Sequence, residues 1–200
     1  MRILLTAFEP FGEHAANASL EASARVAAEG VAGVELHLLV LPVVRGAADV
    51  ALFDALDRVR PDALVMTGIN EHAASIRPER VAINVDDFRI PDNAGYKACD
   101  EPVVDDGPAA YFSTLPLPPI MAELEREELQ AELSNTAGTY ICNHVFYAAR
   151  HRIEIAGLAC RAGFVHLPQM REAAAEDKPS LPLDDIVRGL RAVVAAVARG

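Results

Sequence analysis

Cys142 is the residue of this chain whose type and position most clearly allow chemistry. It follows the small, turn-prone segment 134–139 (SNTAGT) and precedes an apolar run, residues 145–149 (VFYAA), that predicts a helix. A thiol at a helix N-terminus faces unpaired backbone N–H groups and the positive end of the helix dipole, and both favour the thiolate. Because the thiolate attacks carbonyl groups, Cys142 is a candidate nucleophile for a cysteine hydrolase.

A cysteine hydrolase also needs a base and a group that orients this base. Among the six histidines, His166 is best placed, because it ends the apolar run 162–165. Polar residues at the carboxyl ends of strands line the ligand crevice of α/β sheets. Three carboxylates are candidate orienting groups, namely Glu79, Asp86 and Asp87.

Short apolar runs alternate with helical patterns along the chain, which is typical of a sheet with helices on both faces. The patterns predict strands at residues 3–7, 34–40, 63–67, 80–85 and 158–166, and helices at residues 50–59, 120–129 and 183–197. We therefore expect residues 1–200 to form a single domain of the α/β class. Its architecture is predicted to be an α/β/α sandwich with a twisted, mixed and mostly parallel sheet. Residues 90–108, rich in Pro, Gly and Asp, predict a long loop that covers a site or, alternatively, only the surface.

Composition and cysteine usage limit the partners and the compartment. The net charge of −11 argues against nucleic acid and anionic membranes as partners. No apolar run reaches the roughly 20 residues that span a bilayer, and the apolar N-terminus is too short for a signal peptide. Three cysteines, an odd number, favour a reducing cytoplasm. Cys142, His144 and His166 lack the spacing of zinc ligands, so neither a metal nor a cofactor is expected.

Six motifs spread over nearly the whole chain resemble those of the pyrrolidone-carboxylate peptidases, also called pyroglutamyl peptidases type I. They are residues 6–12 (TAFEPFG), 78–84 (PERVAIN), 88–93 (FRIPDN), 107–111 (GPAAY), 136–144 (TAGTYICNH) and 163–168 (GFVHLP). That family removes N-terminal pyroglutamate from peptides with a Cys/His/Glu triad and needs no metal or organic cofactor. The resemblance implies a cysteine exopeptidase, pyroglutamyl peptides as substrates, and a homodimer or homotetramer.

Carried over by motif, the resemblance implies a triad of Cys142, His166 and Glu79, which agrees with the candidates chosen from the residues. Backbone N–H groups near Ile141 and Cys142, together with Arg89, are expected to stabilise the oxyanion. Further residues match the family's substrate pocket, namely Phe8, Phe11, Asn17, Ile69, Ile90, Tyr140 and Ile141. The alternative for Phe8 and Phe11 is ordinary core packing, and for Asn17 an N-cap of the following helix.

One segment departs from the family pattern. Where the family has GQAGGR, residues 68–73 read GINEHA, so that a glycine pair is replaced by Glu71 and His72. Glycines allow backbone angles that are closed to other residues, and we expect this loop to take another path. Ala7 and Glu13 are smaller departures. Two alternatives therefore remain: an amidase of altered acyl specificity, and an inactive relative that binds N-blocked peptides.

Overall fold

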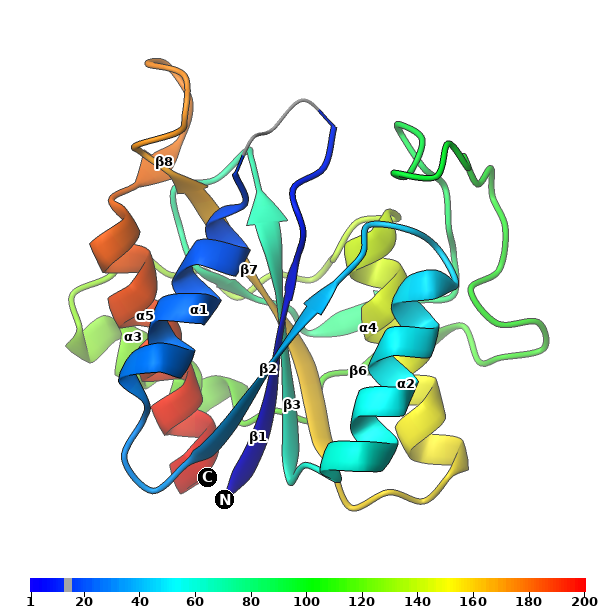
Figure 1. Ribbon diagram of the computed structural model, residues 1–200, viewed down its shortest axis with the longest axis horizontal. Coiled ribbons are helices and arrows are strands. Elements are labelled where there is room, and N and C mark those ends of the chain that lie inside the picture. Colours follow the sequence, from blue (N-terminus) through cyan, green and yellow to red (C-terminus); the bar gives the residue numbers. More distant parts are fainter. Residues whose placement is uncertain (13–15) are drawn as a thin grey trace.

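A six-stranded sheet forms the centre of the protein in the computed structural model, which describes residues 1–12 and 16–200 (Figure 1). Glu13 lies outside these residues. The strand order is β2 (Glu35–Leu41), β1 (Arg2–Phe8), β3 (Ala63–Asn70), β7 (Arg161–Met170) and β4 (Arg77–Pro78), and β8 (Ser180–Leu181) pairs in parallel with the end of β7. Only β4 pairs antiparallel with its neighbour in this sheet. The predicted mixed and mostly parallel sheet is confirmed.

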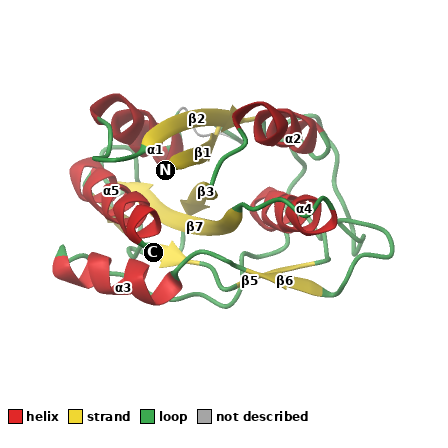
Figure 2. Ribbon diagram, turned by 90° about the horizontal axis from the view of Figure 1, so that it is seen from below, coloured by secondary structure: helices red, strands yellow, loops and turns green. Residues whose placement is uncertain are grey.

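Helices cover both faces of the sheet (Figure 2). One face carries α1 (Ala18–Glu29), α3 (Leu117–Arg126) and α5 (Leu183–Arg199), and the other carries α2 (Ala47–Val59) and α4 (Ile141–Ile155). A separate two-stranded sheet of β5 (Val81–Ile83) and β6 (Ala110–Phe112) lies against α4. The arrangement is the α/β/α sandwich that the sequence predicted.

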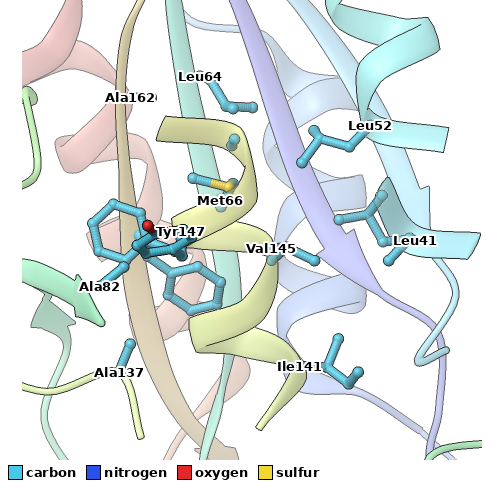
Figure 3. Close-up of a cluster of buried hydrophobic side chains, with 14 of the residues drawn as sticks. Leu41, Leu52, Leu64, Met66, Ala82, Ala137, Ile141, Val145, Tyr147 and Ala162 are labelled. Carbon is cyan, nitrogen blue, oxygen red and sulfur yellow. The ribbon is translucent and has the colours of Figure 1, made fainter. Parts of the chain in front are cut away.

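Alternation along the strands produces two hydrophobic cores, because successive side chains of a strand point to opposite faces. Leu64 and Met66 of β3 belong to the core under α2 and α4, where they lie near Val145 (Figure 3). Ala63 and Val65 of the same strand belong to the core under α1 and α5. Residues 63–68 of β3 are buried on both faces, which explains the nearly continuous apolar sequence of this strand.

Two local signals place helix ends correctly. The helix α2 ends at Val59, and Arg60 follows in the left-handed conformation with φ of 46°, directly before Pro61. Proline disfavours helical angles in the residue before it, which explains the position of this end. In α5, Asp184 and Asp185 occupy the first turn, where the positive end of the helix dipole stabilises their charges.

Three predicted elements are shifted. The strand expected at 80–85 is only β5, and it pairs with β6 outside the main sheet. The strand expected at 158–166 begins at Arg161, because the turn after Gly157 occupies the residues before it; Cys160 is therefore buried beside the strand rather than within it. The helix expected at 120–129 is α3, which begins earlier because prolines are favourable in a first helical turn.

The segment 90–108 contains no helix or strand and is the predicted long loop. Its free cysteine, Cys99, is exposed. Among residues 1–12 and 16–200, no helix is long and apolar enough to cross a membrane.

Candidate active site

Cys142 is the second residue of α4, at the carboxyl edge of the sheet. Tyr140 is the N-cap residue, with an extended backbone (φ −100°, ψ −168°) and no side-chain capping hydrogen bond. The first backbone N–H groups of α4, on Ile141 and Cys142, therefore have no side-chain cap and border a cavity. This is the helix-start position that the sequence predicted for the thiol.

The segment before α4 is held in a turn by its own small polar side chains. Gly138 has φ of 76°, which favours glycine at this position. The N–H of Thr136 donates to Ser134 Oγ at 3.3 Å, and the N–H of Gly138 donates to Thr136 Oγ1 at 3.1 Å. Thr139 Oγ1 then donates to the carbonyl of Asp87 at 2.7 Å, which ties the turn to the loop after β5. These contacts explain the composition of residues 134–139.

Gly68, near the end of β3, lies directly beside the thiol. A Cβ atom at this position would be 2.8 Å from Cys142 Sγ and 2.9 Å from Phe164 Cζ. Both distances are too short for real side-chain atoms, so that only glycine fits here without displacing the sulfur or the aromatic ring. Nothing in the sequence alone identified this requirement.

His166 and Glu79 form a buried pair next to Cys142. His166 lies on β7, opposite Gly68 of β3 and Arg77 of β4. Its Nδ1 is 2.7 Å from Glu79 Oε1, and the exposed fractions of the two side chains are only 8% and 0%. The N–H of Glu79 also donates to the carbonyl of Phe164 at 2.9 Å, which fixes the carboxylate relative to β7.

The pKa of His166 is raised. Burial alone lowers it, but hydrogen bonding with Cys142 and Glu79, together with their negative charges, outweighs burial and raises the pKa from 6.5 to about 9. The ring is thus predominantly an imidazolium near neutral pH, with the Glu79 carboxylate on one side and the sulfur on the other. A cation beside a cysteine sulfur favours the thiolate over the thiol in general.

The other two candidate orienting carboxylates do not contact His166. Asp86 is fully buried and instead pairs with His144 and Arg45. Asp87 is exposed in the wall of the cavity. Of the three carboxylates, the structure brings only Glu79 to the histidine.

A cavity of about 450 Å³ opens above Cys142 and His166. Its volume lies within the range of roughly 300–1,000 Å³ that is usual for small-molecule sites. The remaining predicted site residues all line it: Phe8, Phe11, Asn17, Ile69, Arg89, Ile90, Tyr140 and Ile141. Glu79 lies behind His166, outside this lining. The cavity thus combines a mostly apolar wall with a few polar groups.

Phe8 and Asn17 combine the functional and structural roles that the sequence left open. Phe8 is 3% exposed and belongs to the core under α2 and α4, yet it also lines the cavity. Asn17 is the N-cap of α1, because its Oδ1 accepts from the N–H of Ser19 at 2.9 Å, while its Nδ2 donates to the carbonyl of Glu9 at 3.1 Å. Within residues 1–12 and 16–200, the second amide hydrogen of Asn17 has no acceptor.

The whole chain matches one known family. The family described as pyroglutamyl peptidase matches residues 1–200. The chain belongs to the pyroglutamyl peptidase family. It is 43% identical over 197 residues to a pyrrolidone-carboxylate peptidase of Vibrio campbellii, with 98% of this chain and 92% of the relative covered. A pyrrolidone-carboxylate peptidase of Chromobacterium violaceum is 47% identical over 201 residues, with 99% and 93% covered.

Solved structures agree with this membership. Pyroglutamyl peptidase I of Bacillus amyloliquefaciens superposes with a TM-score of 0.95 at 35% identity, covering 100% of this chain and 97% of that one. A mutant pyrrolidone carboxyl peptidase of Pyrococcus furiosus gives a TM-score of 0.95 at 33% identity, with 100% and 99% covered. The family predicted from the six motifs is confirmed, and the fold is that of pyroglutamyl peptidase I.

The segment that departs from the family motif lies in the cavity wall. Ile69 and Asn70 still belong to β3, and Glu71 and His72 continue the lining beyond the strand. His72 is exposed, and its N–H donates to Asn70 Oδ1 at 3.0 Å. This member of the pyroglutamyl peptidase family therefore carries an acidic side chain and a histidine beside its site.

Sequence reasoning missed how strongly the residues after the nucleophile are anchored. Asn143 is fully buried, and its side chain accepts from the N–H of Ile83 at 2.9 Å and donates to the carbonyls of Ile83 and Val85 at 2.9 and 3.0 Å. The sequence carried a signal for this anchor, because Asn143 is a polar residue at the start of an otherwise apolar helical segment. Asn143 thus fixes the start of α4 to β5.

His144 makes two hydrogen bonds, both to carboxylates. Its Nδ1 is 2.7 Å from Asp86 Oδ2, and its Nε2 is 2.9 Å from Asp49 Oδ2. Burial lowers the pKa of His144, but these hydrogen bonds and charges outweigh burial and raise it to about 9. Arg45 Nε donates to the same Asp86 oxygen at 2.8 Å. Within the described residues, no group of three or more His, Cys, Asp or Glu side chains is arranged to hold a metal ion.

Proposed function

We propose that this chain removes N-terminal pyroglutamate from peptides as a cysteine exopeptidase, with Cys142, His166 and Glu79 as its catalytic residues. Membership of the pyroglutamyl peptidase family supports the reaction. The observation that carries the residue assignment is the buried 2.7 Å contact between Glu79 and His166, next to a cysteine at a helix start. We infer that residues 1–200 act as one catalytic domain.

Acylation begins with attack of the Cys142 thiolate on the pyroglutamyl carbonyl carbon. The resulting oxyanion accepts hydrogen bonds from the N–H groups at the start of α4, and Arg89 in the cavity wall is a further donor. His166, protonated near neutral pH, gives its proton to the departing amine as the C–N bond breaks. The products of this step are a free peptide and a thioester on Cys142.

Deacylation uses the same groups in reverse. His166, now neutral, accepts a proton from a water molecule, which attacks the thioester carbonyl. The carbon–sulfur bond breaks, pyroglutamate leaves as a free acid, and the thiolate and imidazolium are restored. Glu79 orients the ring through Nδ1 and stabilises its charged form.

The acyl group is a small neutral lactam, and the cavity wall suits it. Phe8, Phe11 and Ile90 offer apolar surface, and Asn17, as far as the described residues show, keeps one amide hydrogen for a carbonyl oxygen. Tyr140 and Ile141 place the helix start beside the reacting carbonyl. Ile69, near the end of β3, offers an aliphatic side chain and backbone hydrogen-bonding groups to the acyl group.

We also propose that the enzyme works in the cytoplasm as a homodimer or homotetramer. All three cysteines are free, as expected in a reducing compartment. The oligomeric state rests on the resemblance to the family and is measured by light scattering during gel filtration. Nucleic acid and membranes are not proposed as partners, in line with the charge of −11.

Hydrolysis of pyroglutamyl-7-amido-4-methylcoumarin by the wild type and by Cys142→Ala tests the reaction and the nucleophile together. We expect turnover by the wild type and none by the variant. A folded but inert wild type would contradict the proposal, and other N-acyl reporters would then test an amidase of altered specificity. Binding of N-blocked peptides without turnover would identify an inactive relative.

Alkylation kinetics provide an independent test of the nucleophile. Iodoacetamide should modify Cys142 faster than Cys99 at pH 7, although Cys99 is the more exposed thiol. Cys160 should react slowest, because burial raises its pKa to about 11. Peptide mapping by mass spectrometry gives the three rates, and faster reaction at Cys99 would contradict the activation of Cys142.

A further inference from the structure

The cavity is chemically divided along the sheet. At the β1 end, its lining is apolar and includes Phe8, Phe11 and Val43. At the β4 end, beyond β7, its lining is polar and includes Arg77 and Ser134. Cys142 and His166 lie between the two halves, because the sulfur adjoins Gly68 of β3 and the imidazole is on β7.

The order of these strands fixes the direction in which a peptide substrate lies, given the proposed function. The group that protonates the departing amine must be within hydrogen-bond reach of it, and this group is His166. His166 lies on the β4 side of the nucleophile, since β7 separates β3 from β4. The pyroglutamyl ring therefore occupies the apolar half, and the residue that follows it occupies the polar half.

Arg77 contributes a positive charge to this polar half. Its backbone pairs with His166, and its side chain is 27% exposed. Nε donates to Ser75 Oγ at 3.3 Å, and Nη2 donates to Glu132 Oε2 at 2.6 Å. Within the described part of the chain, Nη1 makes no hydrogen bond and keeps its two donors. Glu132 itself is 61% exposed, so it is a solvated partner that only partly neutralises the guanidinium.

We propose that Arg77 determines specificity for the residue after pyroglutamate by binding a carboxylate. The carboxylate is the side chain of an acidic residue in a longer peptide, or the C-terminal carboxylate of a pyroglutamyl dipeptide. Guanidinium groups match carboxylates in charge and geometry. Two acidic residues, Glu71 and Asp87, also line the cavity, so the effect of Arg77 is seen in ratios between substrates rather than in absolute rates.

The test compares kcat/KM for pyroglutamyl peptides that differ only in charge. C-terminally amidated peptides with Glu or Gln after pyroglutamate isolate the side chain, and pyroglutamyl-alanine with a free or amidated C-terminus isolates the terminal carboxylate. In Arg77→Gln, we expect the preference for at least one carboxylate-bearing substrate over its neutral partner to fall by about two- to fivefold relative to wild type, the range of an exposed ion pair.

Glu132→Gln is the matched control, because it removes the competing charge and leaves Arg77 in place. The same preference should rise in this variant, so that the two substitutions act in opposite directions. If both ratios stay as in wild type in Arg77→Gln, or if the two variants shift them in the same direction, the specificity role is refuted. Glu132→Gln alone gives the sign if Arg77→Gln does not fold. A wild type that cleaves none of these peptides would instead refute the proposed function, and with it this role.

Discussion

The buried bridge from Asp49 through His144 to Asp86 predicts a specific dependence of stability on pH. The His144 side chain is 2% exposed, and its pKa is raised from 6.5 to about 9 by the two carboxylates. A shift of this size corresponds to roughly 3 kcal/mol of free energy of unfolding. Because the folded-state pKa lies above the unfolded value, this contribution is complete below pH 6.5 and is lost as the pH rises through 9.

The perturbation is His144→Gln, and the assay is urea unfolding followed by circular dichroism between pH 6.5 and 10. An amide cannot carry the charge, and the variant leaves two carboxylates without their shared cation. At pH 6.5 we expect a loss of about 3–5 kcal/mol in the free energy of unfolding, as for other broken buried ion pairs. The difference between wild type and variant should then shrink by roughly 3 kcal/mol by pH 10.

Taking the difference between the two proteins removes the contribution of His166 and of the tyrosines, which titrate in both. His37→Gln is a matched control, since His37 pairs with Glu35 at 2.9 Å but is 40% exposed. It should change stability by less than about 1 kcal/mol. A difference for His144→Gln that stays constant from pH 6.5 to 10 would refute the reasoning, because the ring would then be neutral.

Three further predictions concern the site and the domain. Gly68→Ala should lower kcat/KM at least about tenfold and lower the free energy of unfolding by about 1–3 kcal/mol, because the new Cβ would meet Cys142 and Phe164. Reporter hydrolysis and urea unfolding measure the two effects, and full activity of the variant would contradict the prediction. Glu79→Gln should lower kcat by about 10²–10⁴-fold and move the alkaline limb of its pH profile to lower pH, since it removes a charge that raises the pKa of His166. Residues 1–200 should unfold in one transition, with coincident near- and far-ultraviolet dichroism curves, whereas separated curves would indicate more than one domain.

The positions of strands β1, β2 and β3 and of helices α2 and α5 followed well from hydrophobic periodicity, because buried parallel strands and amphipathic helices leave strong patterns. The α5 stripe and the β3 run are examples. The predicted boundaries were wrong where short-range effects dominate, as at the prolines in the first turn of α3 and at the turn near Gly157. The small β5–β6 sheet was misplaced, because the partner of a three-residue strand is not encoded in its own sequence.

The predicted site residues were found from position and motif, and the structure gathers them around one cavity. What the sequence could not provide is distance. Glu79, Asp86 and Asp87 carry the same carboxylate group, so that without the family motif the sequence could not choose between them. In the structure, the pairing of β4 with β7 brings Glu79 to His166. The same holds for Gly68, whose importance depends on a sulfur 74 residues away in the chain.

The three consecutive residues Cys142, Asn143 and His144 explain how a reactive thiol is held in place without a side-chain cap. Successive helical residues point about 100° apart, so each of the three meets a different part of the protein. Cys142 borders the cavity, Asn143 bonds to the backbone around β5, and His144 bridges Asp49 and Asp86. The first turn of α4 is therefore fixed by two buried polar anchors on either side of the nucleophile. Because these anchors are side chains that follow Cys142, the N–H groups at the start of α4 stay available to the substrate. A substitution that weakens either anchor should therefore lower kcat even where the protein still folds.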